Sequence, residues 1–97
     1  MLEQLFSRSL SRYTSSPHAA DLEAFATMVA ARGLDNRRTE RHTRRLLRVL
    51  DTGALPPNAT IGADVLRAAF AAWPHKGYVG TWRLYCRYLQ EHGRLAN

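Results

Sequence analysis

NRRTERHTRRLLRVL, residues 36–50, is the stretch that decides the fold, because it predicts a helix with one cationic and one apolar side. At about 100° per residue, four of its six arginines project within roughly 60° of one another, and these are Arg37, Arg41, Arg44 and Arg48. Arg38 and Arg45 widen the stripe. The opposite side carries Thr43, Leu46, Leu47 and Leu50. A helix of this kind buries its leucines in a core and leaves its arginines outside.

The chemistry of arginine favours phosphate as the partner of this stripe. Its guanidinium is always charged and forks onto phosphate oxygens in a bidentate way, so the stripe has the electrostatic character of a nucleic-acid-binding surface. Glu40 is the only acidic residue in the stretch, so neutralisation by i,i+4 ion pairs is largely unavailable. A solvated charged face is the alternative that the stretch alone leaves open.

Composition agrees with a small basic globular protein. The chain has 97 residues, a formal net charge of +6 and a pI of about 10.4, and lysine provides only one of its 14 cationic side chains. This preference for arginine favours phosphate recognition, although a GC-rich genome also raises arginine and alanine. A chain of this length forms one domain with a modest core.

Targeting and redox signals are few. Cys86 is the only cysteine, which excludes an internal disulfide and suits a reducing compartment. No apolar run is long enough to span a membrane, and the N-terminus lacks the apolar core of a signal peptide. Residues 1–16 are rich in arginine and serine, so a mitochondrial presequence is an alternative, against which Glu3 counts. We expect a cytoplasmic protein, associated with the nucleoid when bound to DNA.

Apolar periodicity predicts an all-α bundle of four main helices, with almost no strand signal. Residues 1–16 are expected to hold a short helix from Leu2 to about Leu10 and a polar linker, ahead of a bundle over residues 17–97. The first bundle helix should begin beside Pro17 and end at Gly33, and the arginine-rich helix should start at Asp35 or Asn36 and end near Asp51. Thr60 should cap a third helix ending at Trp73-Pro74. The last helix is expected over 81–92, after a loop over 75–80 and before Gly93.

Four segments in this order carry a resemblance to a known family. They are Ala31-Arg-Gly-Leu34, the basic helix from Arg38-Thr39 to Leu46-Leu-Arg-Val-Leu50, Thr60-Ile-x-x-Asp64-x-Leu66-x-x-x-Phe70, and Gly80-Thr-x-x-x-Tyr85-x-x-Tyr88-Leu-x-x-x-Gly93-x-x-x-Asn97. Together they resemble the core-binding domain of tyrosine recombinases, the phage-integrase and Xer-type enzymes, over residues 17–97. The resemblance implies a SAM-like bundle of four or five helices that forms one jaw of a clamp around duplex DNA.

The resemblance also implies how the chain would act. The family's catalytic Arg, Lys, His and Tyr belong to a second domain that this sequence lacks, so we expect DNA binding in recombination or integration without cutting or joining. Candidate DNA-binding residues are Arg37, Arg38, Arg41, Arg44, Arg45, Arg48, Lys76, Thr81, Arg83 and Arg87. The backbone amides of Gly80 and Thr81, at the expected helix start, are a further phosphate site. Six neutralised phosphates would give a slope of about −5 for log K against log salt.

Metal binding has little support in the sequence. The spacings of Cys86, His42, His75 and His92 fit no compact metal site, so no cofactor or metal is expected. We expect His18, His42 and His92 at the surface. Asp21 is expected near the start of a helix, where its negative charge would interact favourably with the helix dipole. Side chains expected in the core are Tyr85, Tyr88, Cys86, Trp73 and Trp82, although either tryptophan can instead flank a groove.

Two other function classes remain open. The first is a protein–protein module for recombinase self-association or inhibition, which an exposed apolar patch at Leu2, Leu5 and Phe6 would favour. The second is a small helix-turn-helix regulator, which the turn over residues 33–36 permits. Against it, the arginine stripe spans the whole helix, whereas such regulators concentrate contacts in the N-terminal half of the recognition helix.

Overall fold

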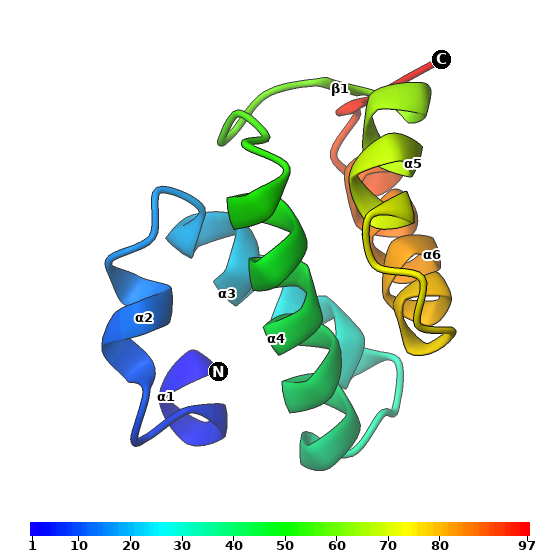
Figure 1. Ribbon diagram of the computed structural model, residues 1–97. Coiled ribbons are helices and arrows are strands. Elements are labelled where there is room, and N and C mark those ends of the chain that lie inside the picture. Colours follow the sequence, from blue (N-terminus) through cyan, green and yellow to red (C-terminus); the bar gives the residue numbers. More distant parts are fainter.

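The computed structural model describes residues 1–97 and is mostly helical, as the periodicity predicted. The elements are α1 (Leu2–Leu5), α2 (Leu10–Thr14), α3 (Ala19–Ala31), α4 (Asn36–Thr52), β1 (Ile61–Gly62), α5 (Ala63–Ala71), α6 (Gly77–Glu91) and β2 (Leu95–Ala96). In Figure 1, α4 runs through the centre, with α1 and α2 on one side, α5 and α6 on the other, and α3 behind. None of the helices has the length and apolar character needed to cross a bilayer.

Helix α4 holds the bundle together because its apolar side packs against both α3 and α6. Its N-terminus is capped as predicted, since the Asp35 carboxylate accepts a hydrogen bond from the Arg38 amide at 2.8 Å. Thr39 and Thr43 are fully buried, and their hydroxyls donate to the carbonyls of Asp35 and Thr39 at 2.9 and 2.7 Å. Both threonines therefore belong to the core, and neither can reach DNA.

The N-terminal segment differs from the prediction twice, first because the helix expected from Leu2 to about Leu10 ends at Leu5. Residues 10–14 form α2, where a polar linker was expected, because Tyr13 packs into the protein and stacks on Phe6 with ring centroids 3.9 Å apart. Leu2, Leu5 and Phe6 are buried in the same hydrophobic cluster as the bundle. The exposed apolar patch proposed for these three residues is therefore absent.

The predicted ends of two helices, at Gly33 and Gly93, are confirmed, whereas the predicted starts of three helices are wrong. Gly33 and Gly93 follow α3 and α6 with φ of 90° and 64°, a left-handed conformation that glycine adopts without strain. Helix α3 starts at Ala19 and α5 at Ala63, each two or three residues later than expected. Helix α6 instead starts four residues early, at Gly77. There the His75 carbonyl accepts from the Tyr78 amide, and His75 Nδ1 accepts from the Gly77 amide at 3.1 Å.

A two-stranded parallel sheet joins the two ends of the α5–α6 unit, and no strand was predicted at either position. Ile61 pairs with Leu95 and Gly62 with Ala96, and the Ile61 amide donates to the Arg94 carbonyl at 2.8 Å. Two residues per strand are too few to show an alternating pattern, so the pairing depends on the tertiary fold.

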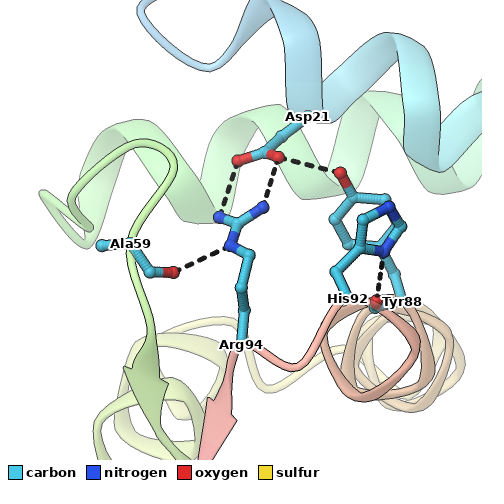
Figure 2. A network of polar contacts seen from close by, with 5 residues as sticks. All are labelled: Asp21, Ala59, Tyr88, His92 and Arg94. Carbon is cyan, nitrogen blue, oxygen red and sulfur yellow. Dashed lines mark hydrogen bonds and ion pairs between the residues drawn. The ribbon is translucent and has the colours of Figure 1, made fainter.

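A buried polar network lies beside this sheet (Figure 2). The Asp21 carboxylate, only 3% exposed, accepts from Arg94 Nη1 at 2.7 Å, from Arg94 Nη2 at 3.0 Å and from the Tyr88 hydroxyl at 2.8 Å. Arg94 Nε also donates to the Ala59 carbonyl at 3.0 Å. Asp21 does lie in the first turn of α3, as expected, but its carboxylate is buried and bonded to Arg94, because the fold brings together groups 73 residues apart.

Two histidines also lie deeper than expected. His18 is 4% exposed, at the residue preceding α3, and not at the surface. His42 is half-buried in the middle of α4, with Nδ1 2.8 Å from the Thr81 hydroxyl. His92 is exposed, as predicted.

Candidate nucleic-acid interface

Four arginines of α4 point into solvent with no acidic partner. They are Arg37, Arg38, Arg41 and Arg48, and we call them the arginine face. Because the other side of α4 is fixed in the core, these charges project from a rigid support. Three of the fourteen cationic side chains form ion pairs, namely Arg32, Arg44 and Arg94. The arginine face therefore keeps its positive charge in the folded protein.

Arg44 is partly neutralised. It forms an i,i+4 ion pair with Glu40, and both side chains are roughly half-exposed. This is the one ion pair of the α4 arginines, so such pairs are largely unavailable, as expected from Glu40 being the only acid in residues 36–50. Arg44 is consequently a weaker phosphate ligand than its sequence position suggests.

Arg45 is held by the start of α6. Its Nη1 donates to the Gly77 carbonyl at 3.1 Å, and its guanidinium carbon lies 5.6 Å from the centre of the Tyr78 ring. Arg48 Nη1 also donates to the Tyr78 hydroxyl at 3.3 Å. Tyr78 is buried and therefore supports the arginine face from behind.

The remaining cationic candidates, apart from α4, divide into two groups. Lys76 is exposed and adjoins Gly77, so it lies beside the arginine face. Arg83 and Arg87 are exposed on the side of α6 that faces away from buried Tyr85 and form no ion pair, so they make a separate cationic surface.

Thr81 is a correction to the candidate set. Its side chain is fully buried, and its hydroxyl donates to the Gly77 carbonyl at 3.4 Å and contacts His42. Because α6 begins at Gly77, Gly80 and Thr81 are its fourth and fifth residues, and the expected helix start at this pair is wrong. The buried Thr81 side chain is not available to a phosphate.

Electrostatics add one residue that the sequence did not indicate. Burial raises the pKa of Tyr13, and the charges of Arg44, Arg12 and Arg48 oppose this rise. Tyr13 therefore lies within reach of the α4 charges, and exposed Arg12, its neighbour in the sequence, is a further cation on α2. No sequence signal marks Arg12 as a candidate.

His42 adds no charge to this region at neutral pH. Burial lowers its pKa, and the neighbouring Arg45 and Arg41 lower the pKa further by repulsion. The imidazole is therefore neutral near pH 7, and the positive potential comes from arginine and lysine.

The other polar groups are structural. Tyr85 and Tyr88 lie in the core as predicted, but the Tyr88 hydroxyl does have an acidic partner, Asp21. Burial and that carboxylate raise the pKa of Tyr88 to about 12, so its phenol stays protonated. Cys86 is only partly buried, and no three His, Cys, Asp or Glu side chains are grouped as a metal site. The arrangement is suited to binding an anion by charge.

Comparison with known proteins returned no relative: no family model, no curated protein and no solved structure matches this chain. The resemblance to tyrosine recombinases therefore stays a prediction from the sequence motifs.

Proposed function

We propose that this protein binds duplex DNA without catalysis, through the arginine face of α4, as the core-binding domain of a tyrosine recombinase would. The observation that carries the proposal is the set of four exposed, unpaired arginines on one side of a helix whose other side is buried. Lys76 adds an exposed cation next to Gly77, whose carbonyl accepts from Arg45 of α4.

Physical reasons favour duplex DNA as the partner. Guanidinium groups bind phosphate oxygens in pairs, and the major groove is wide enough to admit an α-helix. Contacts of this kind position a protein and carry no sequence information, whereas an arginine that is bidentate to guanine would specify a site. The protein–protein alternative loses its expected patch, since Leu2, Leu5 and Phe6 are buried.

The number of free arginines sets the expected salt dependence. Arg44 is paired with Glu40, and Arg45 is half-buried and bonded to Gly77, so four of the six arginines of α4 are exposed and have no acidic partner. Four neutralised phosphates give a slope of about −3.6 for log K against log salt, shallower than the −5 or so that six would give.

The test is fluorescence anisotropy with a labelled random-sequence duplex about three helical turns long, titrated at several salt concentrations. Arg37→Gln/Arg41→Gln is compared with Arg8→Gln/Arg67→Gln, a control that removes two equally exposed charges outside the arginine face. We expect the first pair to weaken binding about tenfold at low salt and to make the slope shallower by about 2, with the control close to wild type. Equal losses in both double variants would contradict the proposal.

A further inference from the structure

An apolar groove lies between α5 and α6, and one of its lining residues, Tyr78, also contacts Arg45 and Arg48 of α4. Its volume is about 370 Å³, and its apolar walls are Phe70, Ala71, Trp73, Pro74, Val79 and Trp82, with Tyr78 behind them. Both tryptophans of the chain line it, and neither is fully buried. The sequence left open whether they would flank a groove, and here they do.

The groove is held in shape by contacts within its wall. Trp73 stacks on Tyr78 with ring centroids 5.1 Å apart, and the Trp73 indole donates to the Thr52 hydroxyl at 3.2 Å. Val79 is 46% exposed, one of two large hydrophobic side chains so exposed on this protein. An apolar ligand that covered Val79 and the two indoles would remove this surface from water.

The charged groups around the groove are all basic. Arg67 lines it from α5, forms no ion pair, and lies close enough to Cys86 to oppose the rise in the pKa of that thiol caused by burial. His75 lines it from the α5–α6 connection, and since its Nδ1 accepts from Gly77, its Nε2 is left as a donor. No acidic residue lines the groove.

We propose that this groove binds a small amphipathic anion, an apolar body ending in a carboxylate that pairs with Arg67. Pockets for small ligands are typically about 300–1,000 Å³, mainly apolar and aromatic, with a few polar groups that fix orientation. The groove has this size and lining, and the unpaired Arg67 selects a negative end group. The site does not depend on DNA binding.

The two indole N–H signals of the ¹⁵N-labelled full chain report on the site, because both tryptophans line it. We would titrate octanoate, butyrate and octylammonium into the chain at about 0.15 M ionic strength, where weak surface pairing is screened. Octanoate carries the proposed chemistry, butyrate keeps its charge with less apolar surface, and octylammonium keeps the apolar chain with the opposite charge.

We expect octanoate to shift both indole signals and the Val79 amide saturably at millimolar concentration, with butyrate and octylammonium much weaker. Arg67→Gln should weaken octanoate binding about three- to fivefold, as expected for a partly exposed ion pair. Arg83→Gln removes an equally exposed charge from α6 outside the groove and should leave the affinity unchanged.

Three results would overturn the proposal. They are indole signals that octanoate leaves unmoved, equal binding of octanoate and octylammonium, and equal binding of octanoate and butyrate. Equal losses in Arg67→Gln and Arg83→Gln would likewise show that Arg67 does not select the anion.

Discussion

Arginine serves two opposite purposes in this protein. On the outer side of α4, Arg37, Arg38, Arg41 and Arg48 are exposed and have no acidic partner. Near the C-terminus, Arg94 is mostly buried, and all three of its guanidinium nitrogens donate to Asp21 or Ala59. The difference teaches that the role of an arginine depends on whether the fold supplies it with acceptors, and not on its local sequence.

Removing the acceptor of the buried arginine should give the largest effect. We expect Asp21→Ala to lower the free energy of unfolding by about 3 kcal/mol, because it leaves Arg94 buried with an uncompensated charge and Tyr88 without its acceptor. Urea denaturation followed by circular dichroism measures the change. Arg41→Ala, on the arginine face, is the comparison and should leave the unfolding midpoint unchanged. Similar losses in both variants would contradict the distinction.

Acid should weaken the same buried pair. Burial alone would raise the pKa of Asp21, but hydrogen bonds from Arg94 and Tyr88, together with the charge of Arg94, hold that pKa below its usual value. A carboxyl with a lowered pKa stabilises the fold above its unfolded pKa of about 4, and this stability is lost as the pH falls through the folded pKa. Denaturation at several pH values should show a steeper loss below about pH 4 in the wild type than in Asp21→Asn. Parallel profiles would show that Asp21 is not the group that titrates.

Two tyrosine hydroxyls, one in each of the two regions, allow a finer comparison of stability. Tyr88→Phe removes a hydrogen bond to a buried carboxylate and should cost about 1.5–2 kcal/mol of unfolding free energy. Tyr78→Phe removes only the 3.3 Å hydrogen bond from Arg48 and should cost about 0.5–1 kcal/mol. Thermal and urea denaturation of both variants checks this order, and a larger loss in Tyr78→Phe would reverse our assignment of their roles.

The smallest predicted effect is the change in DNA affinity when a paired arginine loses its acidic partner. Glu40→Gln releases Arg44, so DNA binding should tighten about two- to fourfold and the salt slope should become steeper by about 0.9. Glu91→Gln is the matched control, because it releases Arg32, which lies at the end of α3 and not on α4. Anisotropy at two salt concentrations measures both variants. An equal gain in Glu91→Gln would mean that net charge, and not the arginine face, sets affinity.

Local patterns predicted the fold well where one residue or one periodicity decides the structure. The apolar and cationic sides of α4, its Asp35 cap and the glycine ends of α3 and α6 follow from sequence-local chemistry. Helix α2, the early start of α6 and the two-residue sheet depend on contacts with distant segments, such as Tyr13 on Phe6 and Ile61 on Arg94, which periodicity cannot indicate.

The residues of the candidate site were likewise predicted only where local spacing decides their position. The sequence identified the exposed arginines of α4 correctly, because helical spacing alone places them. It could not show that Thr81 is buried against His42, nor that Tyr13 of α2 lies within reach of the Arg44 and Arg48 charges, since both follow from how the helices pack. For the same reason, local spacing could not indicate the buried ion pair of Arg94, whose acceptor Asp21 lies 73 residues away.

The most direct test is to follow the arginine side-chain Nε–H signals of the ¹⁵N-labelled protein during titration with duplex DNA. We predict that the signals of Arg37, Arg38, Arg41 and Arg48 shift or broaden, while those of Arg32 and Arg94 stay in place. Signals of the α4 arginines that remain unmoved while Arg83 and Arg87 shift would contradict the account and place the DNA on the outer side of α6.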